Sequence, residues 1–279
     1  MRERANASDM TVNLGFSEEQ IHRYSRHILL REIGGKGQRK LMDSSVLIVG
    51  AGGLGSSSGL YLAAAGVGRL GFVDNDVVDI SNLHRQILHR TSDIGRPKTE
   101  SAADAVRALN PEVKVEQHQV KLTSANAFDI IAGYDLVVEA SDNFPTKYLV
   151  NDACVLLGKP LILGAAVQLL GQIMAIAPRE GPCYRCLFPV PPPPGTVPTC
   201  QEAGVFGPVP GVIGCIQAAE AIKTLVGFGE RLVGHLLIYD ALTAEFTDVK
   251  IERNPSCAVC GDTPTVTGLI DYERFCGER

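Results

Sequence analysis

The chain has 279 residues, a length that predicts one large α/β domain or two small ones. Hydrophobic residues make up 45% and charged residues 20%, and the 29 Gly and 16 Pro stay below low-complexity levels, which excludes a disordered or collagen-like protein. With 26 Lys and Arg against 31 Asp and Glu, the net charge of −5 argues against a nucleic-acid partner.

The N-terminus has no apolar run behind its charged residues, so we expect no secretory signal and a cytoplasmic protein. Residues 1–16 lack an apolar period and are expected to be mobile. A capping box from Ser17 to Gln20 then predicts the start of a helix whose apolar positions run from Ile21 to Leu29.

An uncharged stretch over 44–68 has the hydropathy of a membrane span. It divides at Gly50 into a β-branched strand over 46–49 and a glycine- and serine-rich helix over 54–65, so we expect no membrane segment. A second strand over 70–73 completes a βαβ unit.

The alternation of strand and helix continues along the chain. Its next members are a helix over 99–109, a strand over 113–120, a helix over 126–132, a strand over 135–139, a helix with Pro145 in its first turn and a strand over 161–163. This order predicts an α/β fold with a doubly wound, Rossmann-like and mostly parallel sheet.

The second half changes character. Three further strands, over 171–177, 235–239 and 245–251, are expected to be antiparallel around a helix over 212–226. A Pro-rich segment over 189–198 predicts an exposed extended loop, since it suits neither a helix nor a sheet ladder.

A glycine-rich loop joins the first strand to the next helix, with glycines at Gly50, Gly52, Gly53 and Gly55. Glycines let a phosphate approach the backbone closely, and free N–H groups at a helix start favour its negative charge. Asp74, at the end of the second strand, is placed to reach ribose hydroxyls. The alternative is a turn needed only for close packing, and the loop alone does not distinguish NAD from ATP.

Residues farther along favour ATP. A dehydrogenase needs an apolar nicotinamide slot and a proton donor, whereas the predicted strand ends place Arg85, Lys98 and Asp142 at the carboxyl edge of the sheet. Two cations and a carboxylate suit a triphosphate and its metal ion.

The eight cysteines are too few for a disulfide scaffold, so paired cysteines indicate metal binding or catalysis. Two Cys-x-x-Cys pairs could complete a closed tetrahedral shell around a structural zinc ion, and two redox dithiols are the alternative. Cys154 and Cys215 are expected to be small core residues. The predicted zinc ligands are Cys183, Cys186, Cys257 and Cys260.

Together these motifs resemble the MoeB/ThiF family, the molybdopterin-synthase and thiamine-type sulfur-carrier adenylyltransferases related to ubiquitin-activating enzymes. The resemblance runs from about Ser17 to Gly261. It implies an ATP-binding adenylyltransferase domain with a zinc site over 17–261. The tail over 262–279 resembles the linker that leads to a rhodanese domain in longer relatives.

The resemblance implies ATP- and magnesium-dependent adenylation of the C-terminal glycine of a small ubiquitin-like sulfur carrier ending in Gly-Gly. Molybdopterin, thiamine and tRNA thiolation are the candidate pathways. It implies that Asp74 binds the ribose, that Asn82, Arg85 and Lys98 bind the phosphates, and that Asp142 binds magnesium. The predicted nucleotide contacts are Gly50, Gly52, Gly53, Gly55, Asp74, Asp76, Ser81, Asn82, Arg85, Lys98, Asp142 and Asn143.

For three of the residues, an ordinary structural role is the alternative to the implied functional one. The resemblance makes Arg26 a catalytic residue that reaches the neighbouring site of a homodimer, and the alternative is a solvated helix arginine. It makes Cys200 the thiol that takes the activated carrier as a thioester or acyl-disulfide, and the alternative is a spectator thiol. For Asp76, the alternative to a catalytic role is a turn residue that caps the strand end.

Two rival functions remain at this stage, an NAD-dependent oxidoreductase and a non-catalytic zinc scaffold for a ubiquitin-like partner. A scaffold has no reason to concentrate catalytic charges, so their presence together argues against one; these are Arg26, Arg85, Lys98 and Asp142. Sulfur would reach the carrier from a separate sulfurtransferase if no rhodanese domain follows. No nucleic-acid or membrane partner is expected.

Overall fold

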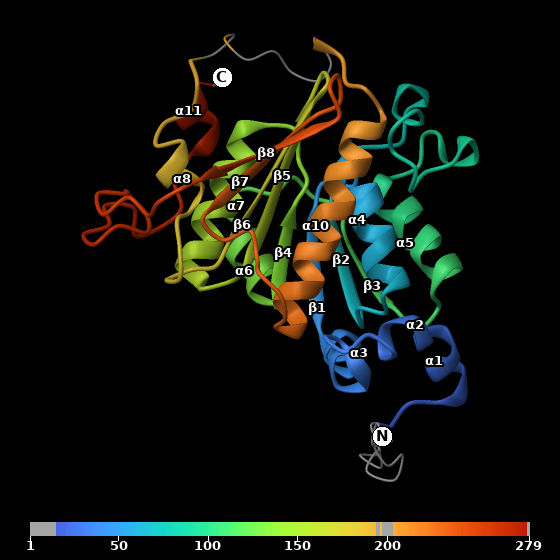
Figure 1. Ribbon diagram of the computed structural model, residues 1–279. Coiled ribbons are helices and arrows are strands. Elements are labelled where there is room, and N and C mark those ends of the chain that lie inside the picture. Colours follow the sequence, from blue (N-terminus) through green and yellow to red (C-terminus); the bar gives the residue numbers. More distant parts are fainter. Residues whose placement is uncertain (1–14, 194–195, 197–202, 278–279) are drawn as a thin grey trace, which may run out of the picture.

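The computed structural model describes residues 15–193, 196 and 203–277 (Figure 1). In this part of the chain the strands form one eight-stranded sheet in the order β3-β2-β1-β4-β5-β6-β7-β8. The first five strands pair in parallel and the last three pair antiparallel, which confirms the predicted fold class. The strands are β1 (Ser45–Val49), β2 (Arg69–Val73), β3 (Lys114–His118), β4 (Leu136–Glu139), β5 (Leu161–Val167), β6 (Leu170–Ile176), β7 (His235–Asp240) and β8 (Glu245–Lys250).

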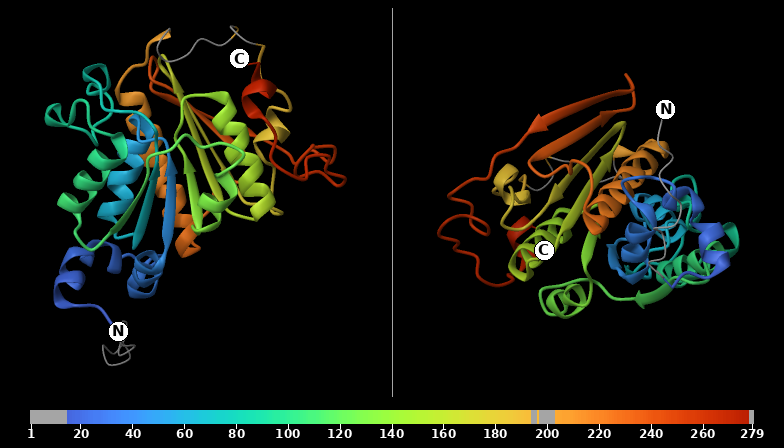
Figure 2. Two further views of the ribbon diagram at one scale, coloured as in Figure 1. Left: turned by 180° about the vertical axis from the view of Figure 1, so that it is seen from behind. Right: turned by 60° about the horizontal axis from the view of Figure 1, so that its bottom comes forward.

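Helices cover both faces of the sheet (Figure 2). The α-helices are α1 (Glu18–Arg23), α2 (Ser25–Ile28), α3 (Gly34–Asp43), α4 (Gly53–Ala64), α5 (Lys98–Leu109), α6 (Ala127–Ala132), α7 (Phe144–Leu157), α8 (Tyr184–Leu187), α10 (Pro208–Val226) and α11 (Tyr272–Cys276). Two short 3₁₀ turns, η1 (Ile80–Asn82) and η2 (Thr91–Asp93), lie between β2 and α5.

The central strand β1 divides the core in two. Its residues alternate between faces, so Val46 and Ile48 pack with α4, α5 and α10, whereas Leu47 and Val49 pack with α6, α7 and α11. All five residues of β1 are buried, as expected for a strand covered on both faces. The glycine loop therefore follows a strand that is packed on both faces.

The N-terminal helix differs from the prediction. The capping box at Ser17 is present, but the helix breaks at Tyr24 into α1 and α2. Tyr24 is buried, and its hydroxyl accepts a hydrogen bond from Asn110 Nδ2 at 2.9 Å. Its ring covers Gly66, where a Cβ would lie 2.5 Å away. Burial of this one ring, rather than helical spacing, decides where the helix ends.

Helices α3 and α11 were not predicted. Three glycines weaken the helix signal of α3, which is held instead by tertiary contacts: Lys40 Nζ donates to the Val226 carbonyl at 3.0 Å, and Gln38 Nε2 donates to the Ala65 carbonyl at 2.8 Å. Helix α11 lies in the tail that resembled a linker, and it packs against α7.

Helix α10 is long and apolar enough to span a membrane by length and composition, and half of its most apolar window is buried in the fold. It packs closely on α4, because a Cβ at Gly214 would lie 2.0 Å from Ser57 Oγ. Gln217, on the buried face of α10, donates to the Glu139 carbonyl at 2.7 Å. Helix α10 is thus a core helix. Cys154 is buried as expected, but Cys215 faces outward from α10 and is exposed.

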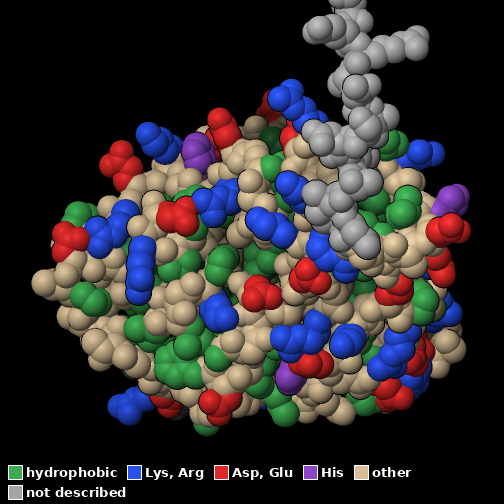
Figure 3. Space-filling model, turned by 90° about the horizontal axis from the view of Figure 1, so that it is seen from below, with side chains coloured by type: hydrophobic (Ala, Val, Ile, Leu, Met, Phe, Trp, Pro, Cys, Tyr) green, Lys and Arg blue, Asp and Glu red, His purple; other side chains and the backbone are tan. Residues whose placement is uncertain are grey.

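The Pro-rich segment has neither helix nor strand over 189–193. Cys200 and most of the remaining segment lie outside the described residues, as do residues 1–14 of the N-terminal segment that was expected to be mobile. On the lower face, which carries α1 to α3, acidic and basic side chains are mixed (Figure 3).

Candidate active site

The main cavity opens at the carboxyl edge of the parallel strands, the upper edge in Figure 1. Its volume is about 860 Å³, and its walls include the segments that follow β1, β2 and β4. The strand order reverses between β1 and β4, and ligands of open α/β sheets bind at such a switch point.

The glycine loop forms one wall of this cavity. Gly50 has φ +96°, and a Cβ there would lie 2.9 Å from the Ala140 carbonyl oxygen. Gly55 does not line the cavity; a Cβ on it would lie 2.0 Å from the Gly50 carbonyl oxygen. These two glycines therefore let the helix approach the strand, whereas Gly52 and Gly53 line the cavity at the start of α4.

His89 supports this loop from behind and was not predicted. It is buried, and its Nε2 lies 2.9 Å from the Ala51 carbonyl oxygen while its Nδ1 lies 2.9 Å from Ser101 Oγ. Ser101 in turn donates to Asp93 Oδ2 at 2.9 Å. Burial lowers the pKa of His89.

Asp74 lies at the end of β2 and faces the cavity. One carboxylate oxygen accepts the Ala51 N–H at 2.8 Å and the other accepts the Asp76 N–H at 2.9 Å. Burial raises the pKa of Asp74, and the nearby Lys98 charge and the two backbone N–H groups oppose that rise. The carboxylate is thus held in a fixed orientation at the position predicted for a ribose.

Lys98 and Arg85 supply positive charge. Lys98 Nζ lies 2.8 Å from Asp76 Oδ2, and the lysine side chain is 8% exposed against 62% for the aspartate. Arg85 also lines the cavity, and its Nη1 donates to the Ser81 carbonyl at 3.0 Å and lies 2.8 Å from His84 Nε2. An incoming anion can therefore compete for both cations without breaking a fully buried ion pair.

The remaining predicted contacts divide into two groups. Asp142 and Asn143 line the cavity at the end of β4, where Asn143 Oδ1 also caps α7 by accepting the Thr146 N–H at 2.9 Å. Ser81 and Asn82 do not line it, since both hydrogen bond with Asp79 in the capping box of η1. In this structure their side chains shape the loop that carries Arg85.

A buried ion pair supports the segment before Asp142. Lys147 Nζ lies 2.5 Å from Glu139 Oε2 and also donates to the carbonyls of Ser141 at 2.8 Å and Gly164 at 2.7 Å. The other Glu139 oxygen accepts the Ser141 N–H at 2.8 Å. Burial raises the pKa of Glu139, while Lys147 opposes that rise.

Several lining residues were not among the predicted contacts. Gln86 is buried, and within the described part of the chain its Oε1 has no hydrogen-bond partner. In the sequence, only its position directly after Arg85 pointed to it. Lys121, Ser124 and residues 269–273 also line the cavity, and no pattern in the sequence pointed to them.

Arg26 is not brought into this cavity. It lies on α2, below the sheet in Figure 1, whereas the cavity lies at the upper edge. Arg26 is exposed on the surface of the chain. The structure therefore does not place Arg26 at the cavity of its own chain.

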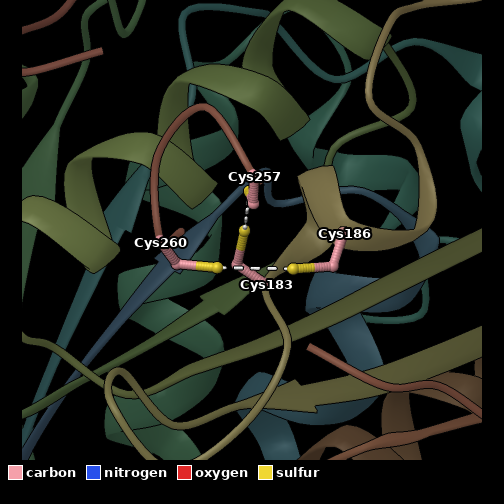
Figure 4. A group of neighbouring side chains, drawn as sticks. All are labelled: Cys183, Cys186, Cys257 and Cys260. Carbon is pink, nitrogen blue, oxygen red and sulfur yellow. Dashed lines mark hydrogen bonds between the residues drawn. The ribbon is translucent and has the colours of Figure 1, made fainter. Parts of the chain in front are cut away.

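The four paired cysteines converge although 70 residues separate the pairs (Figure 4). Their sulfurs all lie within 4.8 Å of one another, with 3.6 Å from Cys183 to Cys257 and 3.3 Å from Cys186 to Cys260. Zn–S bonds of about 2.3 Å put tetrahedral sulfurs about 3.8 Å apart, so the cluster fits a zinc ion. The backbone N–H of Asn254 also points to Cys186 Sγ at 3.4 Å.

The chain is similar to known proteins in sequence and in fold. The model described as the ThiF family matches residues 24–259. The chain is 56% identical over 269 residues to the sulfur carrier protein adenylyltransferase of Thermus thermophilus, which covers 95% of this chain and 99% of that protein. It is 50% identical over 264 residues to adenylyltransferase and sulfurtransferase MOCS3 of Anopheles gambiae, and spans 60% of that protein. The solved structure of E. coli MccB with MccA-N7isoASN is also similar, with a TM-score of 0.78 and 25% identity. The match covers 89% of this chain and 76% of the MccB chain.

Proposed function

This chain belongs to the ThiF family, and from that premise we propose that it is a nucleotidyltransferase that uses ATP to adenylate a small ubiquitin-like sulfur carrier at its C-terminal glycine. One observation carries the proposal: the glycine loop, Lys98 and Asp142 meet in one cavity at the switch point of the sheet. The similarity to a sulfur carrier protein adenylyltransferase over 99% of that protein supports the same activity.

The reaction joins two anions. A carboxylate oxygen of the carrier attacks the α-phosphorus of ATP, a new C–O–P linkage forms, and the bond to the β-phosphate oxygen breaks to release pyrophosphate. No general base is needed, because a terminal carboxylate is already ionised at neutral pH. The barrier comes from bringing negative charges together, so cations placed before the reaction lower it most.

The residues of the cavity suit these demands. The N–H groups at the start of α4 and the side chains of Arg85 and Lys98 would bind the phosphates, while the fixed Asp74 carboxylate would accept the ribose hydroxyls. Asp142 presents an exposed carboxylate to the cavity, and such an oxygen ligand suits a magnesium ion that is also bound by phosphates. When bound, magnesium would supply charge neutralisation at the phosphates.

The test of this function is ATP–pyrophosphate exchange. We expect exchange that depends on a carrier with a free C-terminal Gly-Gly, since the carrier's carboxylate is the nucleophile. A carrier extended by one residue beyond Gly-Gly is the matched control and should give none. Exchange without any carrier, or none with every carrier tested, would contradict the proposal. A change of NADH fluorescence on mixing would instead favour an oxidoreductase.

Several finer assignments belong to the same proposal. We place the enzyme in the cytoplasm as a homodimer in which Arg26 serves the neighbouring site and Cys200 takes the activated carrier. A separate sulfurtransferase would complete sulfur delivery. The relative MOCS3 is named as both an adenylyltransferase and a sulfurtransferase, and this chain spans 60% of its length.

Zinc is proposed for the four-cysteine cluster as a structural ion. The shell is closed by four thiolates, which leaves no open position for chemistry. The ion would join α8, ahead of the Pro-rich segment, to the turn after β8. The unfolded chain has no preformed four-thiolate site, so the free energy of zinc binding would add to the free energy of folding.

We expect about one zinc ion per chain by metal analysis of the purified protein. Cys257→Ser should lower the melting temperature by several degrees, because it removes a buried ligand, while the affinity for ATP changes little. Cys215→Ser is the matched control, since this exposed thiol lies outside the cluster. A folded, active protein that contains no metal would show the zinc assignment to be wrong.

A further inference from the structure

The tail of the chain forms part of the cavity wall. Residues 269–273 line the cavity together with the segment that follows β3. Two contacts join these segments, because Ser124 Oγ donates to the Ile270 carbonyl and Lys121 pairs with Glu273. The tail therefore bridges the carboxyl edge of β3 and the face covered by α7.

A buried network fixes the tail in this position. The Tyr272 hydroxyl donates to Asp152 Oδ2 at 2.7 Å, and Arg185 makes a two-pronged contact with the same carboxylate at 2.8 Å. The Arg185 guanidinium also lies 4.6 Å from the centre of the Phe275 ring. Tyr272, Asp152 and Arg185 are each at most 5% exposed. Figure 1 shows α11 beside α8, which carries Arg185.

The residues that line the cavity include a mainly charged group and a mainly apolar group. Most of its charged groups follow β2 and β4 or begin α5, and they suit the ribose and phosphates. The tail adds three largely apolar side chains, Leu269, Ile270 and Tyr272, together with the acidic Asp271 and with Glu273, which pairs with Lys121. Around the strand ends the apolar lining includes Val49, Val73, Val120 and Leu122, and α7 adds Leu149. An apolar slot beside a ribose site suits the flat face of a purine base.

Resting on the proposed function, we propose that residues 269–273 form the outer wall of the subsite for the purine base of ATP. Asp74 orients the ribose near the end of β2, and the phosphates extend toward the glycine loop. The base then points along the carboxyl edge toward β3, the neighbour of β2 in the sheet. There the segment over 120–125 and the tail enclose the remaining space.

The test compares a ligand that has a base with one that has none. ATP and inorganic tripolyphosphate are titrated calorimetrically into the full chain and into Ile270→Ala. Ile270 is 36% exposed, so its truncation leaves the core intact. The loss of part of one apolar contact should weaken ATP binding about fivefold. The affinity for tripolyphosphate should not change. Arg274→Ala, an exposed position on α11, is the matched control.

Hydrogen exchange of the wild-type chain gives a second readout. ATP should slow exchange of the amides over 269–273, whereas tripolyphosphate should not. Equal ATP affinity in Ile270→Ala together with no ATP-specific protection would overturn this inference and leave the proposed function standing. Failure of the wild-type chain to bind ATP would overturn the proposed function itself.

Discussion

Asp142→Ala should abolish carrier-dependent ATP–pyrophosphate exchange while the protein stays folded. The side chain is exposed at the end of β4 and faces the cavity, so its loss removes a proposed magnesium ligand and no core packing. Loss of charge stabilisation at a phosphoryl-transfer site lowers the rate on the order of a hundredfold or more. The measurement is exchange at saturating carrier, with the melting temperature recorded for both proteins.

Asp129→Ala is the matched control for this variant, because it removes an exposed carboxylate from α6, outside the cavity. It should leave exchange within about twofold of wild type, as expected of a surface substitution. Near-normal exchange in Asp142→Ala would remove this carboxylate from the mechanism. Loss of exchange in both variants would show that the assay reports general instability.

Arg26→Ala should be nearly inactive alone but should regain activity when mixed with inactive Lys98→Ala. In a mixed dimer, one cavity has its own Lys98 and receives Arg26 from the neighbouring subunit, while the other lacks both. With random exchange about half of the dimers are mixed and each has one intact site, so activity should return to roughly a quarter of wild type. Loss of one charge-assisted phosphate contact should cost Arg26→Ala on the order of a hundredfold.

The position of α2 below the sheet motivates this experiment, because Arg26 lies far from the cavity of its own chain. A mixture of Asp142→Ala with Lys98→Ala is the decisive control. Both residues line the same cavity, so neither site of a mixed dimer is intact and no activity should return. If the Arg26→Ala mixture also stays inactive after subunit exchange has been verified by native mass spectrometry, the arginine does not act on the neighbouring site.

The glycine loop and the polar strand ends were predictable from local pattern. A β-branched run before Gly50 and a helix after Gly53 specify a strand–turn–helix unit through short-range interactions. Because parallel strands end at a common edge, the residues after β1, β2 and β4 had to meet there. Asp74, Lys98 and Asp142 therefore line one cavity, as expected.

The paired spacing of the cysteines likewise required no knowledge of the fold. Two Cys-x-x-Cys pairs each bring two thiols to one side of a turn, and one tetrahedral metal site can use all four. The structure supplies what spacing does not, namely the convergence of α8 with the turn after β8.

Long-range contacts decided the remaining features. The five residues of α11 are too few to show a helical period, and their position depends on Asp152 and Arg185, which are far away in the sequence. The break at Tyr24 follows from burial of its ring against Gly66. Local sequence thus specifies the strands, the glycine loop and the polar groups at the strand ends, because each depends on neighbours within a few residues. The tail as a cavity wall and the distance of Arg26 from its own cavity depend on how distant segments pack, and only the folded chain defines that packing.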